Sequence, residues 1–336
     1  MDSFVLVAIL GLAVLMIVHE AGHLLAARAF GMRVVRFSIG FGPALWRYQA
    51  KGSETIYQVA LIPFLAYVQI AGMNPFEEVD PEDKASYANA SLVGRITAIF
   101  AGPLANYLFA SVLFFAALMI GGKHEPTTSV NVLEGPAKAG HMQRGDTILK
   151  IDGIPVTDWD QMRHLILSRA DKQVAIEVLR GQEHLTLKVT PQLKGDGGKI
   201  GVETIEKRIP IGVREAASAS VRMPFSVVQE LVFGLSRIIT GKEKPDFKGP
   251  VGIVKETSKA AELGTPEFLS FLAALSAYLG GFNLLPFPAL DGGRLAFLAY
   301  EAVTRRKPNA RVEANIHAFG LMLLIALITV VTFRGN

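Results

Sequence analysis

Two histidines and a glutamate near the start of the chain have the types and the spacing of a metal-dependent hydrolase site. In His19-Glu20-Ala21-Gly22-His23 the imidazoles are four residues apart, so on a helix they share one face. Both rings can bind one zinc ion, and Glu20 lies beside them, where it can take a proton from water bound to the metal. This H-E-x-x-H pattern predicts that His19 and His23 bind Zn²⁺ and that Glu20 is the catalytic base.

These three residues interrupt an otherwise apolar segment. From Phe4 to Leu25 they are the strongly polar side chains of the sequence. An ionisable group inside a membrane span costs at least a few kcal/mol unless it has a partner or a function. The alternative is a pair of buried histidines that neighbouring groups satisfy, and the apolar setting favours the metal site.

A peptidase zinc ion needs a third protein ligand and one open position. The candidate is Asp291, a carboxylate at membrane depth that follows Pro286 and Pro288, two residues that interrupt a helix. Asn283, at the start of the same segment, can donate a hydrogen bond to a substrate carbonyl or to the oxyanion that forms. In the competing interpretation Asp291 only caps a helix at its N-terminus, as is common in Asp-Gly sequences.

Membrane helices must position these residues. Half of the 336 residues are hydrophobic, and they concentrate in blocks close to or above the roughly 18 apolar residues that suggest a bilayer helix. The blocks are 4–30, 92–121, 268–290 and 316–333. They predict a polytopic α-helical membrane protein with about four transmembrane helices. The first block has no Lys or Arg before Arg28 and is too long for a cleavable signal peptide, so we expect it to be retained.

Basic residues indicate the orientation in the membrane. One cluster follows the first block and another lies between the last two: Arg28, Arg33, Arg36, Arg47 and Lys51; Arg305, Arg306, Lys307 and Arg311. By the positive-inside rule both clusters are cytoplasmic, so the N terminus, the soluble region and the C terminus lie outside, with the active site towards the cytoplasmic side. The net charge of +4 does not indicate nucleic-acid binding, and the lack of cysteine excludes disulfides and thiolate ligands.

Two further segments of the membrane part have recognisable patterns. Val34 to Gln69 alternates around Gly40 and a Lys51–Glu54 turn, which predicts a β-hairpin at the membrane interface or in a cavity. It either pairs with an unwound substrate strand or is only structural. Val213 to Ile239 predicts an amphipathic helix on the outer surface or against the soluble domain, because another crossing would put Asp291 at the wrong face.

The region between the second and third blocks has the composition of water-soluble protein. Residues 127–191 predict a strand at 129–133, a helix at 159–167 and a hairpin of 174–179 with 185–189. This order, with Gly135–Gly140 leading into Arg144-Gly145-Asp146, resembles PDZ domains of bacterial envelope proteases, which bind extended peptides or chain ends by strand addition. The expected organisation is a first membrane half (1–122), an inserted α+β PDZ-like domain (123–194), a linker with the amphipathic helix (195–265) and a second membrane half (266–336).

With these features in hand, the chain resembles the site-2 proteases, a family of intramembrane zinc metalloproteases, and within it the bacterial regulator of sigma-E protease group. The resemblance rests on the histidine motif, Gly40-Phe41-Gly42, Gly102-Pro103 with Asn106, the PDZ unit, Gly249–Ile253 and Asn283–Gly293. It implies that His19, His23 and Asp291 bind zinc, that Glu20 is the general base and that Asn283 helps to hold substrate. The single PDZ unit departs from that group, which has two in tandem.

The resemblance further implies regulated intramembrane proteolysis in the bacterial inner membrane. A first protease removes the outer domain of a single-pass membrane protein, such as an anti-sigma factor, and this enzyme cuts the transmembrane segment. The implied partners are that substrate, membrane lipid and a peptide or chain terminus at the PDZ unit, without nucleic acid. Two alternatives stay open. One is an inactive adaptor that binds envelope peptides, against which the intact Glu20 counts, and the other is a membrane zinc peptidase of another family with Glu301 as third ligand.

Overall fold

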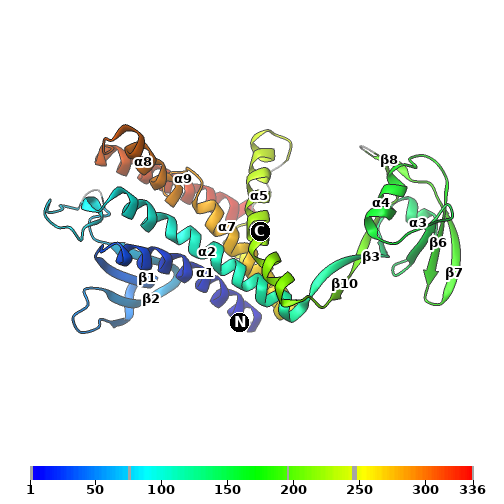
Figure 1. Ribbon diagram of the computed structural model, residues 1–336, viewed down its shortest axis with the longest axis horizontal. Helices are drawn as coiled ribbons and strands as arrows, with labels where there is room; N and C mark the ends of the chain where they lie inside the picture. The colour runs from blue at the N-terminus through cyan, green and yellow to red at the C-terminus, as the bar shows by residue number, and fades with distance from the viewer. Residues whose placement is uncertain (1–2, 75–76, 195–196, 244–247, 335–336) are drawn as a thin grey trace. The chain divides into compact units, whose positions relative to one another are not determined.

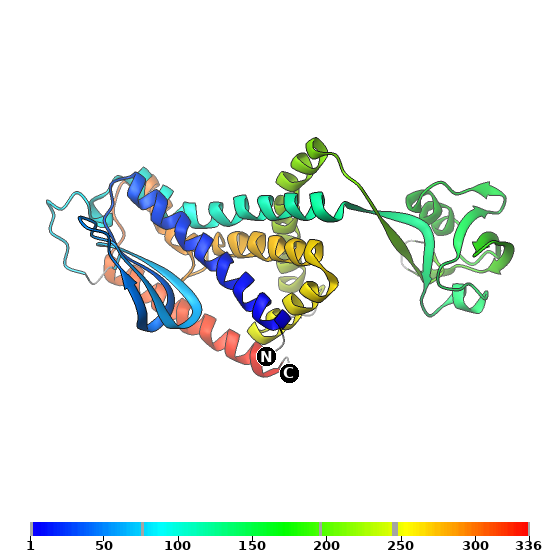
Figure 2. The same cartoon turned by 90° about the horizontal axis from the view of Figure 1, so that it is seen from below.

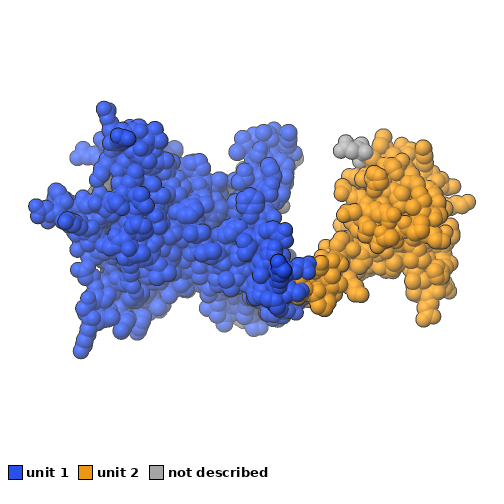
Figure 3. Space-filling view, viewed as in Figure 1, with its two compact units in different colours: residues 1–121, 212–336 blue, residues 122–211 orange. Residues whose placement is uncertain are grey.

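The structure is a computed structural model that describes residues 3–74, 77–194, 197–243 and 248–334. It divides into two compact units, which Figure 3 distinguishes by colour. Residues 1–121 and 212–336 form the first, here called the membrane unit, and residues 122–211 form the second, the soluble unit. The two ends of the chain, 1–2 and 335–336, for which the sequence predicts the side of the membrane, lie outside the described residues.

Three helices in the described part of the chain are long and apolar enough to cross a membrane. They are α1 (Ser3–Ala29), α2 (Leu92–Gly121) and most of α9 (Ala310–Arg334), which correspond to the first, second and fourth apolar blocks. The third block is divided between α7 (Thr265–Asn283) and α8 (Asp291–Thr304). Pro286 and Pro288 lie between the two helices and cannot continue a helix, so the chain turns before Asp291. The apolar block to residue 290 is interrupted there, as the two prolines predict.

Helix α2 lies between α1 and α7, and all three run side by side in Figures 1 and 2. Small residues permit the close approach. A Cβ atom on Gly22 of α1 would lie 2.3 Å from the Ala101 carbonyl oxygen, and one on Gly280 of α7 would lie 2.8 Å from the Pro103 carbonyl oxygen. Backbone contact of this kind is typical of packed membrane helices. Close packing of helix backbones therefore surrounds the turn of α1 that carries the two histidines.

Helix α5 (Val213–Ile239) belongs to the membrane unit and packs against α2 and α7. The Tyr107 hydroxyl of α2 donates a hydrogen bond to the Val221 carbonyl (2.9 Å), and Gly281 of α7 lies directly against Val228. The amphipathic pattern predicts the helix correctly but not its partner, because a buried stripe fits a neighbouring helix as well as an outer surface. Helix α6 (Pro250–Leu263) then packs on α1 and α7.

A β-hairpin follows α1, with β1 (Val34–Tyr48) antiparallel to β2 (Ile56–Ile70). Bulges fold β2 around the first part of β1, so that Phe37 has Tyr57 as one partner and Val68 as another. The hairpin packs on the last turns of α1 through a small apolar core. Its buried members are Leu24, Ala27, Met32, Val34, Phe37, Ile70 and Ala98. The segment after β2 contains a short 3-10 helix, η1 (Tyr87–Asn89).

The soluble unit is an α+β fold built on a sheet with the strand order β10-β3-β4-β6-β7, in which β5 also pairs with β4. Strands β8 and β9 form a separate two-stranded sheet. The bounds are β3 (Lys123–Val132), α3 (Pro136–Ala139), β4 (Thr147–Ile151), β5 (Ile154–Pro155), α4 (Trp159–Leu167), β6 (Val174–Arg180), β7 (Glu183–Val189), β8 (Gln192–Lys194), β9 (Gly197–Lys199) and β10 (Val202–Ile209). The unit continues past residue 194 because β10 pairs with β3.

Candidate metal centre

Helix α1 presents both histidines of the motif to one point. The Nε2 atoms of His19 and His23 are 3.2 Å apart, and the two rings stand nearly perpendicular, at 86°. Both side chains are buried, with relative exposures of 8% and 6%. The four-residue spacing therefore brings the two nitrogens together in the interior of the membrane unit.

Asp291 reaches the same point from the other end of the chain. Its Oδ2 atom lies 3.2 Å from His19 Nε2 and 3.4 Å from His23 Nε2. Asp291 is the first residue of α8, and the N-cap position belongs to Leu290. The preceding loop orients the Asp291 carboxylate. In this loop Ala289 has a left-handed backbone (φ 76°), and its N–H donates to Nδ1 of His317 on α9 (2.9 Å). A turn after α7 thus carries the carboxylate to the histidines, rather than the late part of one long helix.

These three side chains fit a zinc ion. Ligands held at about 2.0–2.1 Å in a tetrahedral arrangement lie about 3.3 Å from one another. The three separations are 3.2, 3.2 and 3.4 Å. Within the described residues, Oδ2 of Asp291 is buried and has no hydrogen-bond partner, which is expected of an atom that serves a cation. Two imidazoles and one carboxylate leave the fourth position for water or substrate, as in catalytic zinc sites.

Helix α2 supports both rings from behind. Nδ1 of His23 donates to the Ala98 carbonyl (2.8 Å), so the lone pair is on Nε2, which faces the other two ligands. Nδ1 of His19 is 3.2 Å from Nδ2 of Asn106. Between them, Gly102 lies against the His23 ring, where an added Cβ atom would be 2.3 Å from Nε2. The stripe of α2 formed by residues 98, 102 and 106 orients the histidines.

The catalytic-base candidate is held by the hairpin. Oε2 of Glu20 accepts a hydrogen bond from the backbone N–H of Val68 on β2 (2.9 Å). Asn283, the predicted substrate-binding residue, is the last residue of α7 and is half-buried. It lies at the start of the loop that ends at Asp291, so one short segment carries both.

Glu301, the alternative third ligand, has another partner. It forms a two-pronged ion pair with Arg95 of α2, at 2.5 and 3.0 Å, and both side chains are largely buried. Across the described ranges, the cluster that could hold a metal ion is His19, His23 and Asp291. The geometry therefore favours Asp291 over Glu301 as the third ligand.

Three supporting residues were not identified as such from the sequence. Ala98 and Val68 act through backbone atoms, which leave no signal in residue type. Asn106 is a polar residue inside an apolar helix, and this signal indicates a hydrogen-bonding role but not the partner.

Comparison with known proteins identifies the family. The profile of Peptidase family M50 matches residues 7–327. A protein of Nostoc sp. PCC 7120 that is named as a zinc metalloprotease is 33% identical, over 96% of this chain and 93% of its own. Zinc metalloprotease RasP of Geobacillus kaustophilus is 28% identical, over 94% and 93%.

The regulator of sigma-E protease RseP of Escherichia coli is 30% identical, over 97% of this chain and 96% of its own. That alignment covers 438 positions against 336 residues here, so RseP has segments, together about the size of a small domain, without a counterpart in this chain. The family match, the near-complete relatives and the three converging side chains lead to one conclusion: the chain belongs to peptidase family M50, the site-2 proteases, and is a zinc metalloprotease.

Proposed function

We propose that this zinc metalloprotease cuts the transmembrane segment of single-pass membrane proteins. The observation that carries the proposal is the depth of the ligand cluster. His19 and His23 lie well inside α1, an apolar helix long enough to span a bilayer, and both are buried. A rise of about 1.5 Å per residue puts His19 roughly 24 Å from the start of α1, within a hydrocarbon layer of about 30 Å. A peptide bond that reaches this site lies below the membrane surface.

Each side chain of the site would have a separate chemical role. His19, His23 and Asp291 would hold the zinc ion, which when bound supplies Lewis acidity that polarises the scissile carbonyl and makes water a nucleophile near neutral pH. Glu20 would accept the proton of the attacking water and pass it to the leaving amine. The Val68 N–H fixes one oxygen of this carboxylate, so we assign the proton transfer to the other oxygen, Oε1. Asn283 would donate to the substrate carbonyl or the oxyanion.

The hairpin is suited to present an unwound substrate. A transmembrane helix hides its amides in its own hydrogen bonds, so it must open before it is cut. The last part of β2 pairs with β1 on one side and directs the Val68 N–H towards Glu20. We infer that an opened substrate segment adds beside this part of β2, next to the catalytic base. Helix-breaking residues near the cut site should then favour cleavage, and equal rates for a uniformly helix-forming substrate would argue against this step.

We infer four spans, α1, α2, α7 with its loop, and α9, with the active site towards the cytoplasm. Contacts within the membrane unit support this orientation. Lys307, from the second basic cluster, donates to the Ala88 carbonyl (2.9 Å), so the two segments that we assign to the cytoplasm touch. At the other ends of the helices, Gly121 lies against Pro266. The setting we propose is the bacterial inner membrane, with the soluble unit outside the cytoplasm.

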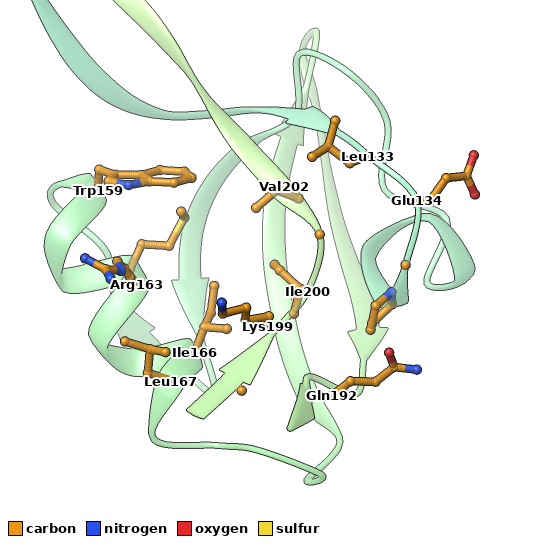
Figure 4. Close-up of a pocket in the computed structure, with 15 residues that line it drawn as sticks. Leu133, Glu134, Trp159, Arg163, Ile166, Leu167, Gln192, Lys199, Ile200 and Val202 are labelled. Carbon is orange, nitrogen blue, oxygen red and sulfur yellow. The ribbon is translucent and has the colours of Figure 1, made fainter. Parts of the chain in front are cut away.

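The soluble unit has a groove suited to a peptide, and we assign the unit as a PDZ domain. Figure 4 shows Trp159, Arg163 and Ile166 projecting from α4 on one side, with Ile200 and Val202 on the facing segment. The cavity is about 530 Å³. Because β10 is the last strand of its sheet, its second edge is open to an added strand. The positive charges of Arg163 and Lys199 at this groove suit the carboxylate of a chain terminus. Reversing one of these charges with Arg163→Glu, at an exposed position, should abolish binding of a carboxylate-ended peptide.

The groove and the family together support a role in regulated proteolysis. A first protease would remove the outer domain of the substrate, the PDZ unit would exclude uncut substrate or sense the new chain end, and the second cut would release a cytoplasmic fragment such as an anti-sigma factor. Lys123 is the pairing partner of Ile209, so deletion of residues 123–209 joins ends that are already adjacent. This deletion should permit cleavage of uncut substrate, and continued dependence on the first cut would argue against the filter.

The decisive experiment compares the purified protein with its Glu20→Gln variant, in lipid with zinc, on a single-pass substrate shortened on its outer side. We expect the parent alone to cut, at a bond that mass spectrometry of the products places within the span. A Glu301→Gln variant is the matched control for loss of a buried carboxylate. Cutting by both proteins, or cutting only outside the span, would refute the proposal.

A further inference from the structure

Asn106 is a fully buried amide in the middle of an apolar helix. Its relative exposure is 0%, and it lies on the face of α2 that packs against α1. One end of the amide, Nδ2, is 3.2 Å from Nδ1 of His19. The other end, Oδ1, is buried without a hydrogen-bond partner among the described residues. A buried carbonyl oxygen without a partner costs about 1–3 kcal/mol, so its position needs a physical reason.

The backbone of Asn106 is anchored independently of its amide. The Ser276 hydroxyl of α7 donates to the Asn106 carbonyl (2.9 Å), and Gly280 leaves room for the Asn106 side chain, whose Cβ would be 3.3 Å from a Cβ added to that glycine. Three helices therefore meet at this residue. The amide can rotate about its own bond without disturbing the helix, and either end can face His19 at the same distance.

Zinc binding determines which end of the Asn106 amide must face Nδ1 of His19. A neutral imidazole carries one hydrogen, and when Nε2 uses its lone pair for a metal the hydrogen is on Nδ1. Nδ1–H is a donor and requires an acceptor, which Oδ1 provides and Nδ2 does not. For His23 the Ala98 carbonyl already plays this part at 2.8 Å. The Ala98 carbonyl and the Asn106 amide, both on α2, thus lie next to Nδ1 of His23 and Nδ1 of His19. These are the ring nitrogens that do not face the ligand cluster.

We propose that Asn106 is the positioning residue for the zinc ligand His19, and that it acts by accepting the Nδ1–H hydrogen bond through Oδ1. The inference rests on the proposed ligand set. In the bound state the amide turns its oxygen to the ring, which holds the tautomer with a free Nε2 lone pair and the ring orientation that aims it at Asp291. Groups of this kind typically change metal affinity by about 10–100-fold.

The test measures zinc affinity of the full-length protein in detergent by competition with a chromogenic chelator. Asn106→Leu keeps the approximate volume but has no acceptor, and it should bind zinc about 10–100-fold more weakly. Asn106→Asp is isosteric and can only accept from Nδ1–H while ionised, so it should restore affinity to the parent value or better. Ser276→Ala removes a hydrogen bond to the same residue without changing the amide, and it should leave the affinity within about threefold.

Cobalt substitution gives a second readout that packing alone would not change. The visible absorption of bound Co²⁺ depends on ligand geometry, so it should shift in Asn106→Leu and return in Asn106→Asp. Parent-like zinc affinity in Asn106→Leu overturns the proposal. If that variant does not fold, Asn106→Asp decides alone, because a tenfold loss would mean that the amide donates instead of accepts. His19→Ala tests the proposed ligand set separately from the role of Asn106. Unchanged zinc affinity in this variant would refute the ligand set itself.

Discussion

Replacement of Gly102 by alanine should remove His23 from the metal site while adding a single methyl group. Gly102 lies on α2 directly against the His23 ring. A Cβ atom at this position would be 2.3 Å from Nε2, 2.5 Å from Cε1 and 2.8 Å from Cδ2. All three distances are below any real Cβ contact. The methyl group and the present ring position are therefore incompatible.

The size of the effect follows from these distances. Non-bonded heavy atoms pack at about 3.5–4.0 Å, so the ring or the helix must move by about 1 Å. Metal–ligand distances tolerate about 0.2 Å, so a displacement of this size breaks the bond between His23 and the metal. We expect the zinc affinity to fall by at least about 100-fold, the upper end of the range for supporting residues. The overpacking itself should lower the free energy of unfolding by about 1–3 kcal/mol.

The assay is chelator competition for zinc, together with cleavage of the shortened single-pass substrate. Gly94→Ala, on the same helix, is the control: its Cβ would be 3.1 Å from Phe30 Cδ1 and Ser91 Oγ, which are side-chain atoms that can shift. It should retain zinc and activity. If Gly102→Ala bound zinc as tightly as the parent, the close approach of α2 to His23 would not be a property of the working enzyme, and the reasoning would be refuted.

Three other outcomes are expected. Glu301→Gln should keep zinc bound, which metal analysis checks. It should lower the free energy of unfolding by a few kcal/mol, because it leaves the buried Arg95 without its charge partner, and a denaturation experiment measures this loss. Burial raises the pKa of Asp146, but hydrogen bonds from Arg180 and from the Gln143 N–H, with the charge of Arg180, outweigh this and hold the pKa below its usual range. The ionised Asp146 therefore stabilises the soluble unit at pH values above the pKa of an unfolded aspartate, and this stabilisation is lost as the pH falls through the lower pKa of the folded state. Arg180→Ala should reduce this pH dependence in amide-exchange measurements, because the Gln143 N–H still donates to the carboxylate. Val68→Pro removes the N–H that donates to Glu20, the proposed catalytic base, so kcat should fall while zinc affinity is unchanged.

Local patterns were sufficient for most of the long elements and for the shared face of the two histidines. The spacing of His19 and His23 determines that both rings face one way, because helical periodicity is a property of neighbouring residues. Apolar run length predicts α1, α2 and α9 in the same way. Alternation over Val34 to Gln69 predicts the hairpin, which in the structure ends at Ile70. The predicted helix at 159–167 coincides with α4.

What the sequence by itself determined is therefore which residues can do chemistry and which segments are helices or strands. Only the tertiary structure decided how far Asp291 is from the two histidines, that α5 packs on α2 and α7, and that Asn106 lies beside Nδ1 of His19. These are contacts between segments far apart in the chain, and they depend on the packing of glycines and backbone carbonyls at helix crossings. No periodicity within one segment encodes the identity of its neighbour, so such contacts are visible only when the helices are packed together.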